Sequence, residues 1–141
     1  MPIIGLAFTS FEANKKPKPI KGEIKVNSTP KIIGVKEVNI GTLNKKGMSV
    51  TFEFETKYAP DLADIKVGGE VIYLPKTLAI VMKAWKKDKK LPEEINIEIL
   101  NHLFRRCLLK IAYMADDLQL PPPIGIPVLK PQGAGQANYI G

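Results

Sequence analysis

PEEINIEILNHLFRRCLLKIAYMADDLQLPPP (residues 92–123) is the stretch that decides the fold. Pro92 suits the first position of a helix, and Glu93 and Glu94 complement the positive end of the helix dipole. Apolar residues then recur three or four positions apart, which predicts one buried stripe on a long amphipathic helix. The stripe consists of Ile95, Ile99, Leu103, Phe104, Cys107, Leu108, Ile111, Met114, Ala115 and Leu118. The helix is expected to end before Leu120, because Pro121 disfavours helical geometry in the residue ahead of it. At 1.5 Å per residue it spans roughly 37 Å, enough to cover a sheet.

The clearest strand in the chain is MSVTFEFETKY (residues 48–58), in which two sets of side chains alternate strictly. A period of two places successive side chains on opposite faces of a sheet, so one face is expected to be core and the other wet. The core face consists of Met48, Val50, Phe52, Phe54, Thr56 and Tyr58, and the wet face of Ser49, Thr51, Glu53, Glu55 and Lys57. Residues 63–74 return after a turn at residues 59–62, which predicts an antiparallel hairpin. Gly68 and Gly69 in the returning strand indicate a bulge or a close backbone approach.

Three further strand-like runs precede this hairpin, at residues 3–13, 20–26 and 31–43. Turn-forming residues occupy positions 27–30 and 44–47, where they are expected to separate the strands. In the last of the three runs, most of the apolar residues occupy odd positions in the first half and even positions in the second, so they would change from one face of the strand to the other. A bulge between Val35 and Val38 would reconcile its two halves.

A shorter helix is expected to begin at Lys76, because apolar residues follow at helical spacing. They are Leu78, Val81, Met82 and Trp85. Two helices thus follow a run of strands without βαβ alternation. The fold class is therefore α+β, with an antiparallel β-meander of about four to five strands and a long second helix packed on the sheet. Residues 1–126 are expected to form this single domain, and residues 127–141 a Pro/Gly-rich extended C-terminal arm.

The chain is basic, with 21 Lys and Arg against 14 Asp and Glu, a net charge of +7 and a pI near 9.5. Nearly all the cations are lysine, which neutralises phosphate but lacks the planar fork of arginine, so any RNA contact would go to the backbone. A solvated lysine-rich surface gives the same composition, and both interpretations stay open. The candidate phosphate contacts are Lys83, Lys86, Lys87, Lys89, Lys90, Arg105 and Arg106.

No catalytic or metal-binding constellation stands out in the sequence. His102 is the only histidine, which excludes a His dyad and a His-rich metal site. Cys107 is the only cysteine and lies on the apolar stripe, so a disulfide is excluded and an inert core thiol is expected. Asp116 and Asp117 point about 100° apart on a helix, which does not build a carboxylate pair. We therefore expect neither an enzyme nor a cofactor.

Nothing in the sequence predicts a membrane protein. The opening residues MPIIGLAF have no cationic region and too short an apolar run for a secretion signal. No window approaches the roughly 18 apolar residues of a membrane span. A cytoplasmic location is therefore expected.

Binding to another chain is better supported by the pattern of the long helix. His102, Leu109 and Tyr113 form a second, weaker apolar strip away from the main stripe. A helix that is apolar on more than one side is usually covered on more than one side. One side would rest on its own sheet, and the other is a candidate to meet a second subunit or a client. Trp85, inside the basic segment, is expected to anchor the first helix in the core rather than to stack on a base.

Several short features resemble SecB, a family of tetrameric export chaperones. Phe11-Glu12-Ala13 lies near the start, and four antiparallel strands, a helix, a linker and a long helix follow. The segment Leu118-Gln119-Leu120-Pro121-Pro122 is similar to the Leu-polar-Leu-Pro-type segment after the last helix of that family. The resemblance covers roughly residues 3–126. It implies a holdase that binds unfolded polypeptides in apolar grooves beside the long helix and assembles through sheet edges and helices. The chain departs from this family in being basic where the family is typically acidic.

The predicted function is that of a polypeptide-binding chaperone that works without a cofactor, as a homo-oligomer. The candidate polypeptide or oligomer contacts are Val50, Phe52, Phe54, His102, Leu109 and Tyr113. An alternative from another class is a basic accessory protein of the ribosome or another ribonucleoprotein. Its lysine patches would bind RNA phosphates, and its C-terminal arm would thread into the assembly.

Overall fold

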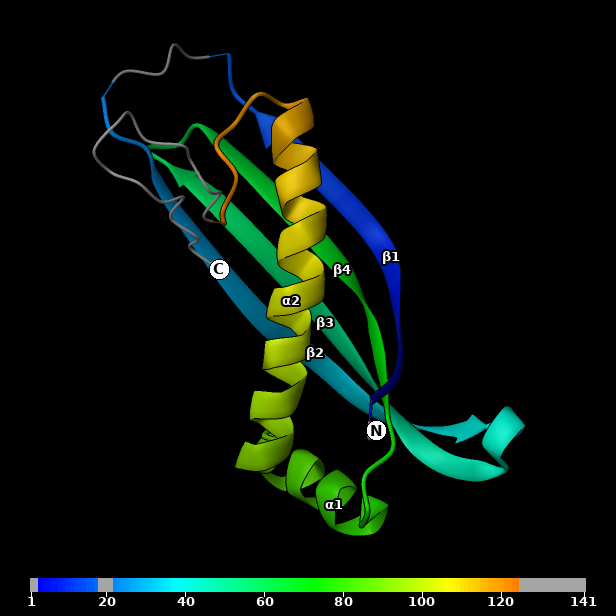
Figure 1. The fold of residues 1–141 in the computed structure, drawn as a ribbon. Helices are drawn as coiled ribbons and strands as arrows, with labels where there is room; N and C mark the ends of the chain where they lie inside the picture. The colour runs from blue at the N-terminus through cyan, green and yellow to red at the C-terminus, as the bar shows by residue number, and fades with distance from the viewer. Residues whose placement is uncertain (1–2, 18–21, 125–141) are drawn as a thin grey trace, which may run out of the picture.

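The computed structural model describes residues 3–17 and 22–124. Its elements are β1 (Ile3–Lys15), β2 (Lys25–Ile40), the 3₁₀ turn η1 (Gly41–Leu43), β3 (Lys45–Ala59), β4 (Ala63–Tyr73), α1 (Leu78–Asp88) and α2 (Glu93–Asp117). The strands form one sheet, α2 lies across one face of it, and α1 lies near one end (Figure 1). The predicted α+β class, with two helices after the strands and the second one long, is confirmed. The arm expected at residues 127–141 lies outside the described residues, so its boundary with the domain stays a prediction.

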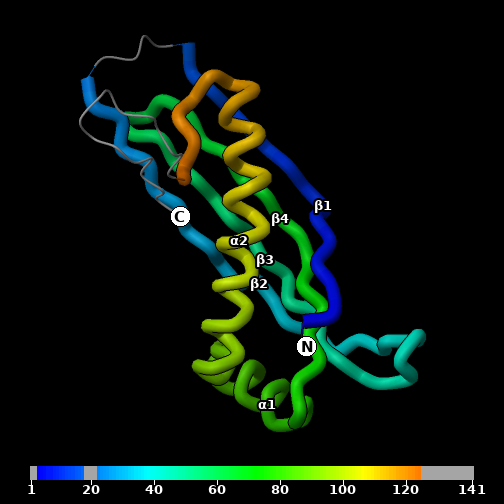
Figure 2. Tube along the Cα trace, in the orientation of Figure 1, coloured from blue at the N-terminus to red at the C-terminus, as the bar shows by residue number. Residues whose placement is uncertain are grey.

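All neighbouring strands of the sheet run antiparallel, in the order β1-β4-β3-β2. The expected meander consists of β2, β3 and β4, and β1 joins the free side of β4. The two strands that come first in the sequence therefore occupy opposite edges of the sheet, as the trace in Figure 2 shows. Each edge strand leaves one row of backbone groups without a neighbouring strand among the described residues.

The alternation predicted for residues 48–58 is confirmed in β3, at the centre of the sheet. The core residues of β3 are Met48, Val50, Phe52, Phe54, Thr56 and Tyr58, all at most 1% exposed. On the opposite face, Lys66 lies 3.7 Å from Glu53 across the strands. Ser49 is the exception on that face, because it is buried and its hydroxyl has no hydrogen-bond partner in the described structure.

The turn predicted at residues 27–30 is wrong. These residues belong to β2, where Pro30 pairs with Phe54 of β3. A proline is tolerated there because β2 is an edge strand, and the missing N–H can face away from the sheet. The predicted bulge exists but lies earlier, between Ile32 and Gly34, so that Ile33 is the extra residue.

The boundaries of β2 and of the following turn also differ from expectation. The strand expected at residues 20–26 begins only at Lys25, and residues 20–21 lie outside the described part of the chain. The turn expected at residues 44–47 lies earlier, at η1 and Asn44. Asn44 has a φ of 50°, in the left-handed region that asparagine tolerates, and Lys45 already begins β3.

The close backbone approach expected at Gly68 and Gly69 is confirmed between β4 and β1. The register shifts between Phe8 and Ser10, opposite the two glycines, so the bulge lies in β1. A Cβ atom at Gly69 would lie 2.1 Å from the backbone oxygen of Ala7. Only a residue without a side chain fits at this point of the pair.

The core lies between α2 and the sheet. On the face of α2 that meets the sheet, the fully buried residues are Ile99, Leu103, Cys107, Ile111 and Ala115. The rest of the predicted stripe is partly buried, except that Phe104 is 36% exposed at its edge. In α1, Val81 is buried and Trp85 is half-buried against the same core, which agrees with the expected anchoring role.

Candidate functional site

Three of the six predicted contact residues belong to the core. Val50, Phe52 and Phe54 are 0–1% exposed, on the face of β3 that α2 covers. Because no other chain can reach them in this arrangement, they are core residues and not part of a contact surface. This corrects their place in the predicted set.

The other three predicted residues lie on one side of α2. Leu109 is 62% exposed and Tyr113 is 73% exposed, and both are large apolar side chains. His102 is half-buried. Burial, followed by the positive charges of Arg106 and Arg105, lowers the pKa of the His102 imidazole below its ordinary value. The imidazole is therefore neutral at pH 7 and adds no charge to this strip.

The contacts of two cations on α2 with a ring of β1 show which side of the helix faces β1. The guanidinium of Arg106 lies 6.0 Å from the ring centre of Phe8, and the ammonium of Lys110 lies 5.7 Å from it. Leu109 and Tyr113 follow three residues after Arg106 and Lys110, respectively, so they continue the same side of the helix. We call Phe8 and Phe11 of β1, together with Leu109 and Tyr113 on this side of α2, the β1 flank.

Sequence reasoning missed the contribution of β1 to this surface. Phe8 and Phe11 are three positions apart, and a regular strand would place them on opposite faces. The bulge between Phe8 and Ser10 places both on the α2 side, where their ring centres are 5.4 Å apart. Phe8 also makes an edge contact with the core residue Phe52, whereas Phe11 is 49% exposed. The sequence signal that could have indicated this bulge is the pair Gly68 and Gly69, which lies opposite it in β4.

A second apolar surface lies on the other side of α2, toward β2. Arg106 and Phe104 are two residues apart, about 200° around the helix, so they lie on opposite sides. The ring of Phe104 packs edge-on against Phe54, with centres 5.3 Å apart. Ile97, seven residues earlier on the same side, is half exposed. Exposed apolar side chains thus border α2 on both sides.

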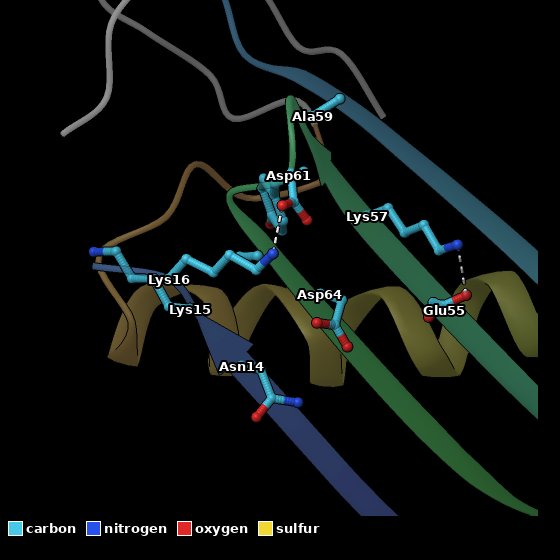
Figure 3. Close-up of a pocket in the computed structure, with 10 residues that line it drawn as sticks. Asn14, Lys15, Lys16, Glu55, Lys57, Ala59, Asp61 and Asp64 are labelled. Carbon is cyan, nitrogen blue, oxygen red and sulfur yellow. Dashed lines mark hydrogen bonds and ion pairs between the residues drawn. The ribbon is translucent and has the colours of Figure 1, made fainter. Parts of the chain in front are cut away.

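A hollow at the end of the sheet farthest from α1 is lined mostly by charged side chains (Figure 3). It has a volume of about 400 Å³ and lies around the turn between β3 and β4. Lys16 forms an ion pair with Asp61, and Lys57 lies 3.7 Å from Glu55. Lysines and carboxylates neutralise each other here, and neither His102 nor Cys107 lines the hollow.

The remaining chemistry of the described residues is sparse. Burial raises the pKa of the Cys107 thiol to about 12, so the thiol is protonated at neutral pH. No group of three or more His, Cys, Asp or Glu side chains in residues 3–17 and 22–124 is arranged to hold a metal ion. Within the same residues, neither helix combines the length and the apolar character that a membrane crossing requires.

The predicted phosphate contacts are divided between two places. The five lysines Lys83, Lys86, Lys87, Lys89 and Lys90 are exposed on α1 and just after it. Arg105 and Arg106 are exposed on α2, about 18 Å along the helix from its first residue. Arg106 lies over Phe8 and belongs to the surroundings of the β1 flank. The structure therefore does not bring the arginines and the lysines into one patch.

Comparison with known proteins gives a likeness in fold. No protein-family model matches the chain, and no curated protein matches it. Among solved structures, the chain is similar to the Rv1957 SecB-like chaperone of Mycobacterium tuberculosis, solved in complex with a ChAD peptide from the Rv1956 HigA1 antitoxin. The TM-score is 0.54 at 13% sequence identity, and the match covers 91% of this chain and 88% of that chain. The chain therefore has the fold of a SecB-like chaperone.

Proposed function

We propose that this chain is a polypeptide-binding chaperone of the holdase type, which acts in the cytoplasm without a cofactor and without catalysing a reaction. The observation that carries the proposal is the β1 flank. Its exposed side chains, Phe11, Leu109 and Tyr113, come from an edge strand and from the helix beside it. Exposed apolar side chains gathered in this way are typical of a surface that meets another chain.

The strength expected of this surface suits transient holding. Fully burying a large apolar side chain is worth about 1.5–3 kcal/mol, so covering three half-exposed ones contributes a few kcal/mol. Ordering an unfolded segment offsets part of that gain. Binding at one such surface is therefore weak and reversible. A client that contacts several copies or both sides of α2 would bind more tightly.

The chemistry of the flank favours segments rich in apolar and aromatic residues. Arg106 and Lys110 border it, so a segment with acidic residues next to its apolar ones complements it better than a basic segment. The similar SecB-like chaperone was solved with a bound peptide, which supports a polypeptide as the partner.

Assembly into a homo-oligomer is part of the proposal. The sheet has two exposed edge strands, and apolar side chains are exposed on both sides of α2. A monomer normally leaves less of such surface uncovered. Light scattering on the purified protein measures the mass directly. A discrete multimer is the expected result, and a monomer at all concentrations contradicts this part of the proposal.

The test of function is suppression of client aggregation, followed by light scattering after dilution of an unfolded protein from denaturant. The double variant Leu109→Ser and Tyr113→Ser is expected to bind client about 30-fold more weakly, because each change removes about 1 kcal/mol of burial. A matched control is the double variant Leu43→Ser and Ile80→Ser, which removes two exposed apolar side chains far from the flank. It should suppress aggregation as well as the unchanged protein does.

Two results would overturn the proposal. One is an unchanged protein that never delays aggregation, and the other is an equal loss in both double variants. The far-ultraviolet circular dichroism and the mass of each variant are measured first, so that misfolding or loss of assembly is distinguished from loss of client binding.

A further inference from the structure

The positive charge of the chain is concentrated in one short segment. Residues 76–90 contain six lysines and a single aspartate, which gives +5 of the total net charge of +7. These lysines are Lys76, Lys83, Lys86, Lys87, Lys89 and Lys90. All six are exposed, and none takes part in an ion pair among the described residues. Their charges are therefore available to an outside partner.

The geometry of α1 directs these charges outward. Its apolar face contacts the core through Val81 and, less deeply, through Leu78, Met82 and Trp85. Lys83 and Lys87 are four residues apart, so they lie on one side of the helix, away from that apolar face. Because the apolar face of α1 is used by its own core, little remains to insert into a lipid surface.

Lysines from a distant part of the sequence join the same end of the molecule. Lys45 and Lys46, at the start of β3, line a hollow of about 560 Å³ together with Lys76. Its other lining residues are the apolar Leu74, Pro75 and Leu78. Lys46 lies 3.8 Å from Glu37, but both side chains are well exposed and such a pair is weak.

Two carboxylates limit this surface on one side. Glu94 and Glu98 line a neighbouring hollow that shares Leu74, Pro75 and Lys76 with the first. An anion is therefore expected to extend from Lys45 and Lys46 along the outer side of α1 rather than toward the start of α2. At the far end of α1, the ammonium of Lys89 lies 5.8 Å from the ring centre of Trp85.

We propose that this end of the molecule, formed by Lys45, Lys46, Lys76, Lys83 and Lys87, binds the phosphate backbone of a nucleic acid. A polymer of phosphates matches a row of separate ammonium groups that runs from a hollow along a helix. Lysine offers a point charge without the fork that reads base edges, so the binding is insensitive to sequence. The site lies on other elements than the β1 flank, and it stands whether or not the chain holds polypeptides.

The test is fluorescence anisotropy with a labelled 20-nucleotide single strand, as RNA and as DNA of the same sequence. The triple variant Lys76→Gln, Lys83→Gln and Lys87→Gln is compared with the unchanged protein at several salt concentrations. A matched control carries Lys25→Gln, Lys31→Gln and Lys57→Gln, three exposed lysines of β2 and β3 that lie outside the surface. Both variants lower the net charge equally.

At low salt, the triple variant is expected to bind the single strand at least roughly tenfold more weakly than the unchanged protein does. The slope of the logarithm of the binding constant against the logarithm of the salt concentration should be shallower by about 2, because each of the three lost phosphate contacts contributes about 0.7 to that slope. The control should keep the slope of the unchanged protein. The RNA and DNA arms show which backbone is bound. Three results would overturn the proposal. The first is an equal loss of binding in both variants, and the second is no binding of either strand. The third is that vesicles containing phosphatidylserine bind as tightly as the single strand and lose as much affinity in the triple variant.

Discussion

The phenol oxygen of Tyr73 donates a 2.5 Å hydrogen bond to Oε2 of Glu98, which joins the end of β4 to the first turns of α2. A second tyrosine acts just beyond the other end of the helix. The phenol of Tyr58, in β3, donates a 2.6 Å hydrogen bond to the backbone oxygen of Pro121. The two central strands thus hold the long helix to the sheet near both of its ends.

Replacing Tyr73 by Phe is expected to lower the free energy of unfolding by about 1–2 kcal/mol. The ring still fills its place in the core, but the Glu98 carboxylate loses its donor, and hydrogen bonds to charged groups are worth more than neutral ones. Urea denaturation at pH 7 measures the change. Tyr113→Phe is the control, because its phenol is exposed, and it should change stability by less than about 0.5 kcal/mol. Equal effects would contradict the role given to the Tyr73 hydrogen bond.

Stability is expected to fall in alkali because of the same two tyrosines. Burial raises the pKa of Tyr58 to about 12. Burial, the hydrogen bond to Glu98 and the negative charges of Glu98 and Glu94 raise the pKa of Tyr73 further still. The unfolded chain ionises near pH 10, so the stability from these shifts is complete below about pH 10 and is lost as the pH rises beyond it. Urea midpoints measured from pH 8 to 11 should decline as the pH passes about 10, and those of the double variant Tyr58→Phe and Tyr73→Phe should decline less. If the urea midpoints of the two proteins decline in parallel, the two tyrosines do not cause the loss of stability in alkali.

Gly69→Ala is expected to destabilise the pairing of β1 with β4 by about 2–3 kcal/mol. The new methyl group would meet the backbone oxygen of Ala7, and backbone cannot move aside as a flexible side chain does. Gly34→Ala is the control, since a Cβ atom at Gly34 meets nothing within 4 Å. It should leave stability unchanged or raise it slightly, because alanine suits a strand better than glycine. Thermal unfolding of both variants measures the difference in stability. If the Gly69→Ala protein is as stable as the control, β1 and β4 lie farther apart at this point than the structure places them.

The central elements of the fold were predictable because their patterns are strict. The alternation from Met48 to Tyr58 gave β3 with its buried face, and the 3.6-residue period gave α2. The edge strand β2 was less predictable. Pro30 looks like a turn residue, and only the position of β2 at the edge of the sheet makes a proline acceptable there. That position depends on which strands pair across the sheet, which no local pattern contains.

The candidate site was predicted in part, and the missing half has a physical reason. Leu109 and Tyr113 stand out because they are apolar residues outside the main stripe of one helix. Phe8 and Phe11 do not stand out, because their spacing fits neither face of a regular strand. The bulge that brings them together depends on Gly69 in another strand. Val50, Phe52 and Phe54 were placed in the contact set because alternation identifies a buried face without saying what buries it.

Cys107 provides a direct test of how firmly α2 is packed on the sheet. Burial raises the pKa of its thiol to about 12, so the thiol is almost entirely protonated at pH 8. Iodoacetamide should therefore label the folded protein only when α2 opens, at a rate that rises steeply with small additions of urea. Labelling of the fully unfolded chain should be rapid, and mass spectrometry counts a single added group because Cys107 is the only cysteine. If the folded and unfolded proteins react at similar rates, α2 spends much of its time away from the sheet. Client binding would then draw on the whole inner face of the sheet, including Val50, Phe52 and Phe54, instead of the β1 flank alone.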